Sequence, residues 1–182
     1  VGHDGVMTSR PTRPLGADQI ERLDELLAAS ARIARRHFHG DLADLAASDK
    51  NGAGSRGVHG GHGGHGGYDP VTEADRAIEE LLRAGITAML PGDAVVGEEN
   101  GRSGPEEASR TWYLDPIDGT KAFLTGMAGW GTLVGVVEDG RAVAGWMDQP
   151  VLGETFSAVG GRAVVRRPAP EGGPVRITDL RT

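Results

Sequence analysis

The chain has 182 residues, enough for one substantial domain, and its lack of cysteine excludes disulfides and thiolate metal sites. Its formal net charge of −7 argues against a general nucleic-acid binder, because the sequence has no run of basic residues that could bind the phosphates of a nucleic acid. No apolar run approaches the roughly 20 residues of a membrane span, and the start of the chain lacks the apolar core of a signal peptide. We therefore expect a cytoplasmic protein with no membrane partner and no nucleic-acid partner.

Two amphipathic helices are expected in the first half of the chain. Apolar residues fall mainly on one helical stripe from residue 18 to about residue 39, where glycine can stop the helix. A second stripe begins near Thr72 and runs to Met89, and Pro91-Gly92 ends it.

The segments outside these helices divide the chain. Residues 48–67 are rich in glycine and cannot bury a core, so we interpret them as a flexible loop. We expect residues 1–16 to be a disordered arm or an artificial extension, and residues 17–182 to form one domain. Three histidines in the loop could grip nickel, copper or zinc, but a glycine expansion without a ligand is the interpretation we favour. These histidines are His59, His62 and His65.

Strand patterns replace helical ones after residue 93. Short apolar runs occupy residues 94–97 and 111–114, and residues 174–178 form one more. Between them, turn pairs at Asp139-Gly140 and Gly160-Gly161 predict two hairpins. Two helices followed by five or six strands, mostly linked by hairpins, predict an α+β fold in which the helices cover one face of a largely antiparallel sheet.

Two aspartates stand three residues apart after the run at 111–114. Carboxylates about 4 Å apart repel by about 4 kcal/mol at an effective dielectric of 20, so bringing Asp115 and Asp118 together requires a cation such as Mg²⁺, Ca²⁺ or Mn²⁺. Gly119-Thr120 can open a turn or helix whose free amides face an anion. Taken alone, the aspartates fit equally well as caps of a turn.

Two further acidic clusters strengthen the metal interpretation. Glu98 and Glu99 end another apolar strand, where active sites often gather. Asp75 stands near the start of the second helix, three residues after Thr72. That spacing also resembles a capping box, in which Asp75 would serve only the helix start, and the local sequence leaves both roles open.

In chain order, the motifs "DPVTEAD", "GEEN" and "DPIDGTKAF" resemble those of the inositol monophosphatase superfamily. With "TKAF" and "DQPVLGE" the chain is most similar to the histidinol-phosphate phosphatase branch. The resemblance covers roughly residues 17–182 apart from the glycine-rich loop. It implies the N-terminal half of an αβαβα sandwich, and Lys50 would be a displaced counterpart of a lysine that the family often carries near its metals.

The resemblance also implies a site with two or more Mg²⁺ ions. Glu98, Asp115 and the backbone carbonyl of Ile117 would hold the first ion. Asp115 would bridge to the second ion, which Asp118 would also bind. The superfamily supplies a further aspartate from a second half of the fold, and no matching Trp-Asp motif occurs in this chain.

Phosphate binding and proton transfer are implied at neighbouring positions. The amides of Gly119 and Thr120 would hold the phosphate, and Thr120 with Asp75 would orient and help deprotonate the attacking water. Glu99 is expected to act behind the metal ligands, and Lys121 to be a solvated surface residue.

The expected function is a Mg²⁺-dependent phosphomonoesterase acting on a small phosphorylated alcohol. The first substrate is histidinol phosphate, from histidine biosynthesis, and the alternative is inositol 1-phosphate. The other alternative is a catalytically incomplete metal-binding half-domain that needs a partner or a C-terminal half, and we expect the chain to be weakly active or inactive alone. The resemblance further suggests a homodimer.

Overall fold

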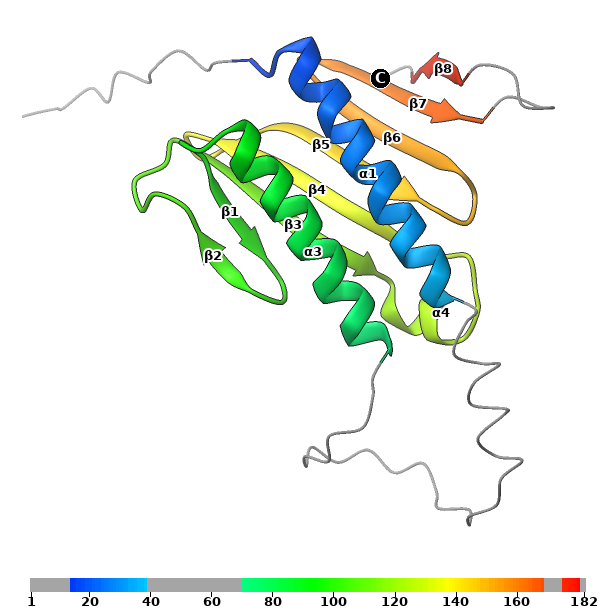
Figure 1. The fold of residues 1–182 in the computed structure, drawn as a ribbon. Coiled ribbons are helices and arrows are strands. Elements are labelled where there is room, and N and C mark those ends of the chain that lie inside the picture. The colour runs from blue at the N-terminus through cyan, green and yellow to red at the C-terminus, as the bar shows by residue number, and fades with distance from the viewer. Residues whose placement is uncertain (1–13, 39–69, 169–174, 181–182) are drawn as a thin grey trace, which may run out of the picture.

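The computed structural model describes residues 14–38, 70–168 and 175–180, which form two long helices, one short helix and a single sheet. The elements in chain order are α1 (Ala17–Phe38), α3 (Pro70–Met89), β1 (Ala94–Gly97), β2 (Gly101–Ser103), β3 (Arg110–Asp118), α4 (Thr120–Leu124), β4 (Gly131–Glu138), β5 (Arg141–Gln149), β6 (Glu154–Val159), β7 (Arg162–Arg167) and β8 (Arg176–Asp179). Helices α1 and α3 lie side by side across one face of the sheet (Figure 1).

The sheet has the order β2-β1-β3-β4-β5-β6-β7-β8. Strands β1 and β3 pair in parallel, because the short antiparallel strand β2 between them returns the chain to the end of the sheet at which β1 began. Every other pairing among the described strands is antiparallel. The carboxyl ends of β1 and β3 therefore meet at one edge of the sheet.

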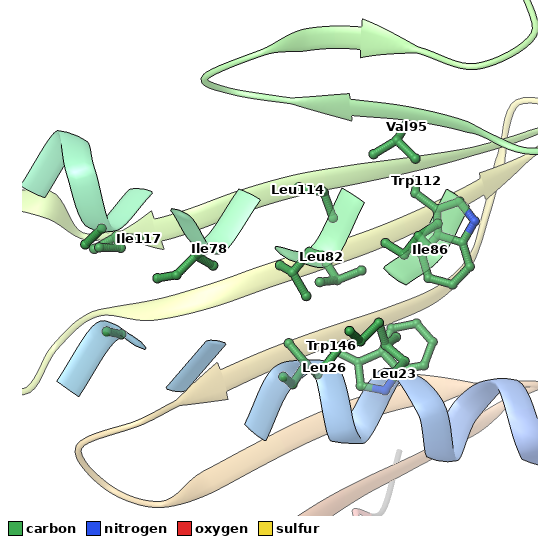
Figure 2. Close-up of a cluster of buried hydrophobic side chains, with 14 of the residues drawn as sticks. Leu23, Leu26, Ile78, Leu82, Ile86, Val95, Trp112, Leu114, Ile117 and Trp146 are labelled. Atoms are coloured by element: carbon green, nitrogen blue, oxygen red, sulfur yellow. The ribbon is translucent and has the colours of Figure 1, made fainter. Parts of the chain in front are cut away.

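The core lies between the two long helices and the sheet. Leu23 of α1 and Leu82 of α3 are fully buried, as is Trp112 of β3, which stacks on Trp146 of β5 with ring centroids 6.3 Å apart. Figure 2 shows these side chains meeting in one cluster. This packing confirms the predicted α+β class and both helical stripes.

The other face of the sheet carries apolar side chains that are only partly covered. Leu133, Met147 and Phe156 lie in one cross-strand row and line a shallow hollow there. Tyr113 is 47% exposed. In the part of the chain that the structure describes, both long helices lie on the opposite face (Figure 1). This face of the sheet is thus partly exposed to solvent.

The sheet is larger than predicted. It has eight strands within the described residues instead of five or six. Strand β2 has no counterpart among the predicted runs, because it is short and its sequence carries no apolar pattern. Strand β3 also continues to Asp118, although the sequence pattern ended it at Leu114. Pro116 cannot donate a hydrogen bond to the sheet, and a bulge accommodates it.

Several predictions concern residues outside the described ranges. These include most of the arm at 1–16, the whole loop at 48–67 with its three histidines, and Lys50. No helix within the described ranges is long and apolar enough to cross a membrane.

We predict that Leu82→Ala destabilises the fold by about 2–5 kcal/mol, since this side chain is fully buried between α3 and the sheet. The matched control is Leu152→Ala, because Leu152 is 53% exposed and its truncation should change the free energy of unfolding by less than about 0.5 kcal/mol. Urea unfolding of both variants measures the difference. Equal losses would contradict the placement of the core.

Candidate metal and phosphate site

The parallel pairing of β1 with β3 places two acidic side chains next to each other. Gly97 is the register partner of Leu114, and Glu98 and Asp115 each follow one member of that pair. Two elements that are distant in sequence thus deliver carboxylates to the same edge, where ligands commonly bind in such sheets. Of the two, Asp115 is partly buried and Glu98 is exposed.

A bulge in β3 brings the third carboxylate to the same side. Asp115 pairs with Leu133 and Asp118 pairs with Gly131, so three steps along β3 match only two along β4. Residues three apart in a regular strand point to opposite faces, and the extra residue restores Asp118 to the face of Asp115. The Thr132 hydroxyl anchors the bulge by donating a 2.8 Å hydrogen bond to the Pro116 carbonyl.

The surroundings of the Asp115 carboxyl disfavour its charged form. Burial, followed by the nearby charges of Glu98 and Asp118, raises its pKa to about 6, although the Ile117 N–H donates a hydrogen bond that acts in the opposite direction. Its Oδ1 atom is buried and has no hydrogen-bond partner among the described residues. A buried acceptor without a donor is costly, and a cation would satisfy it.

The donor set therefore fits a hard divalent cation. Carboxylate and carbonyl oxygens are the ligands that Mg²⁺ prefers, and Mg²⁺ usually keeps several waters. Within the described residues, no group of three or more acidic or histidine side chains is arranged so that it could hold a metal ion by itself. Glu98 and Asp118 are close enough to Asp115 to interact with it electrostatically, so the three carboxylates offer at most part of a metal's ligands.

A tight glycine corner, formed by Gly119 and Thr120, follows directly. Gly119 precedes α4 with φ of 91°, and a Cβ there would lie 2.8 Å from the Gly129 carbonyl oxygen. The position therefore requires glycine for both backbone conformation and space. Thr120 begins α4, its hydroxyl donates to the Ile117 carbonyl at 3.3 Å, and the first N–H groups of the helix have no intrahelical acceptor.

Aromatic packing fixes this corner against the core. Phe123 of α4 contacts Trp130 edge-on, with ring centroids 4.8 Å apart. Phe38, at the end of α1, lies between 5.2 and 5.4 Å from both rings. The short helix thus packs against the end of α1, which is distant in the sequence, and against the nearby Trp130.

The remaining predicted residues lie on or near α3, which contacts both β3 and α4. Asp75 is buried. The helix begins at Pro70, so Thr72 lies inside it, and the capping-box interpretation of Asp75 loses its N-cap. Glu99 forms a 3.5 Å ion pair with Arg76, and Lys121 is exposed, as expected.

Several buried charged residues were missed from the sequence, and Glu79 is the one that lies next to the site. Glu79 lies on the apolar stripe of α3 and is fully buried, where it forms an ion pair with Arg83. A charged residue at a core position of an amphipathic helix was the available signal, since such residues are rarely buried without a partner.

Comparison with known proteins agrees with this geometry. The profile of the inositol monophosphatase family matches residues 18–172. The chain belongs to this family. A histidinol-phosphatase from Chlorobaculum parvum is 38% identical over 111 residues, which cover 61% of this chain and 41% of the relative. An inositol-1-monophosphatase from Mycobacterium leprae is 40% identical over 99 residues, covering 51% and 33%.

Solved structures of the family share the fold. An inositol monophosphatase from Zymomonas mobilis superposes with a TM-score of 0.57 at 32% identity, covering 91% of this chain and 52% of that structure. The chain spans less than half the length of the two curated relatives. The relatives carry two different substrate names, so family membership leaves the substrate open.

We predict that Gly119→Ala destabilises the protein more than Gly140→Ala does. Both glycines have positive φ, so each alanine costs about 1–2 kcal/mol of backbone strain. A Cβ at Gly140 meets open space, whereas the one at Gly119 meets Gly129 and adds a further loss of about 1–3 kcal/mol. Thermal or urea unfolding measures the difference, and equal losses would show that the corner is open.

We predict that Asp115→Asn stabilises the metal-free protein above pH 6. The folded-state pKa of Asp115, about 6, exceeds the ordinary 3.8, so the folded state loses stability as pH rises between these values. The variant's advantage should therefore grow from pH 4 to pH 6 and then remain constant. Urea unfolding in the presence of a chelator measures it, with the exposed Glu107→Gln as control. A parent that is the more stable of the two at pH 8 would refute the assignment.

Proposed function

We propose that this protein acts in Mg²⁺-dependent hydrolysis of a small phosphate monoester. The observation that carries the proposal is the partly buried Asp115 with its unsatisfied Oδ1, between two acidic neighbours and beside the Gly119 corner. Carboxylates that repel one another are stabilised by a cation between them, and the free N–H groups beside them can bind an anion.

Four groups would hold the metal ions. Glu98, Asp115 and the Ile117 carbonyl would bind one Mg²⁺, and Asp115 and Asp118 a second. Bound Mg²⁺ would neutralise phosphate charge and lower the pKa of the attacking water. The Ile117 carbonyl now accepts the Thr120 hydroxyl, so the same oxygen links the metal site to the corner.

The chain's other residues would bind phosphate and move the proton. The N–H groups of Gly119 and Thr120 would donate to phosphate oxygens, because the start of α4 leaves them without helical partners. Asp75 would accept the proton of the attacking water, and Thr120 would orient that water. The contact of α3 with β3 and α4 supports this role for Asp75.

The substrate we propose first is histidinol phosphate, which would place the protein in histidine biosynthesis. The basis is the Chlorobaculum parvum relative, whose name is histidinol-phosphatase, together with the "DQPVLGE" segment. Inositol 1-phosphate is the alternative, since the Mycobacterium leprae relative is named for it. A homodimer and a cytoplasmic location remain part of this proposal.

The second candidate is a metal-binding unit that needs further polypeptide for turnover. The partly covered apolar row at Leu133, Met147 and Phe156 favours it, because such a face normally packs against another layer. This candidate predicts Mg²⁺ binding without appreciable phosphate release by the chain alone.

We predict that phosphate release requires Mg²⁺ and that Asp118→Asn lowers its rate by at least about 100-fold. Substituting a residue that only supports a metal ligand costs up to about 100-fold, and a ligand itself should cost at least as much. Release of inorganic phosphate from histidinol phosphate and inositol 1-phosphate, with and without Mg²⁺, measures this. Glu107→Gln, an exposed carboxylate away from the site, should match the parent. If the parent releases phosphate, an equal rate in Asp118→Asn would contradict the metal assignment. If the parent binds Mg²⁺ but releases no phosphate, the second candidate is favoured.

A further inference from the structure

Glu79 of α3 binds the turn that follows β1. Its Oε2 accepts the Glu99 N–H at 2.7 Å, and its Oε1 accepts both the N–H and the side-chain amide of Asn100 at 3.0 Å. The side chain is completely buried. One carboxylate thus takes up the donors of two consecutive residues directly after Glu98.

Arg83, one turn further along α3, extends this link. Its Nη2 donates to Glu79 at 2.7 Å and to the Gly101 carbonyl at 2.8 Å. Its Nη1 donates to the Val95 carbonyl at 3.1 Å and to the Ser103 hydroxyl. The pair therefore ties α3 to β1, to β2 and to the turn between them.

The backbone is shaped to receive this carboxylate. A Cβ at Gly97 would lie 2.2 to 2.3 Å from the carboxylate atoms of Glu79, closer than any real contact. Burial alone would raise the pKa of Glu79, but hydrogen bonds from Arg83, Glu99 and Asn100 outweigh it and the pKa is lowered. The buried group is therefore a charged acceptor seated against a glycine.

We propose that Glu79 is a positioning residue of the metal site, which holds the turn at residues 98–100 so that Glu98 stays beside Asp115. Glu98 is exposed, so its location depends on the backbone that carries it. That backbone is fixed on one side by pairing of Gly97 with Leu114 and on the other by Glu79. The inference rests on the proposed function, because it concerns the same Mg²⁺ ions.

The physical cost of the arrangement supports a positioning role. Burying an ion pair seldom adds stability over apolar residues of similar volume, so packing alone does not call for Glu79 and Arg83 at this place. What the pair provides is a unique conformation for a short turn that otherwise exposes its residues.

The first test is Mg²⁺ binding by the full chain, measured by titration calorimetry. Glu79→Gln keeps the shape of the side chain but replaces one carboxylate oxygen with an NH₂ group. This group must face an N–H group of the turn, so the turn loses a hydrogen-bond acceptor. Arg83 also loses its negatively charged partner. We expect Mg²⁺ affinity to fall about 10–100-fold, as for other groups that orient metal ligands. Glu80→Gln makes the same chemical change one residue along, at an exposed site, and should bind Mg²⁺ like the parent.

A second control separates positioning from general destabilisation. Ile86→Val removes one buried methylene from the same helix, far from the turn, and lowers stability without touching it. Its Mg²⁺ affinity should equal that of the parent. Gly97→Ala displaces the Glu79 carboxylate from the opposite side and should weaken Mg²⁺ binding as Glu79→Gln does. A drop in affinity for Ile86→Val as large as that for Glu79→Gln would overturn the proposal.

Amide hydrogen exchange tests the turn without metal. In Glu79→Gln the amides of Glu99 and Asn100 should exchange faster, while those of α3 around Leu82 keep their protection. Unchanged exchange, or unchanged Mg²⁺ affinity in this variant, would overturn the proposal. A parent that binds no Mg²⁺ would contradict the proposed function, and exchange at Glu99 and Asn100 would still decide whether Glu79 holds the turn.

Discussion

Electrostatic repulsion at the carboxyl ends of β1 and β3 is the constraint on which the site depends. One oxygen of Asp115 has no donor among the described residues, and burial, followed by the charges of Glu98 and Asp118, raises the pKa of this carboxyl. A fold that served stability alone would separate these groups or neutralise one of them. A divalent cation between the carboxylates, as the proposed function requires, would relieve this repulsion.

Three local devices hold the repelling groups in place. Parallel pairing of β1 with β3 sets Glu98 beside Asp115, and the bulge in β3 returns Asp118 to the same face. The buried Glu79–Arg83 pair fixes the turn after β1. The large core between the helices and the sheet, where Trp112 is fully buried, offsets the free-energy cost of each of these features. The site thus consists of mutually repelling carboxylates at the carboxyl ends of β1 and β3, supported by a well-packed core.

The helices, the first strand and both hairpins were predictable because each is specified by local periodicity or a turn pair. The extension of β3 through Pro116 was not, since it depends on pairing with β4 and on a bulge that strand periodicity hides. The acidic motifs could be predicted as a group, but their meeting depends on the parallel register of β1 and β3. Glu79 was missed because its partners are backbone amides some 20 residues away, which no spacing rule connects.

A structure determined with Mn²⁺ in place of Mg²⁺, using the anomalous signal of the metal, tests the central claim most directly. The account predicts a peak within about 2.0–2.2 Å of an Asp115 oxygen, the usual range for such metals, with Glu98 or Asp118 as a further ligand. Metal bound only elsewhere, for example at His59, His62 and His65, with the Asp115 carboxyl left protonated, would contradict it.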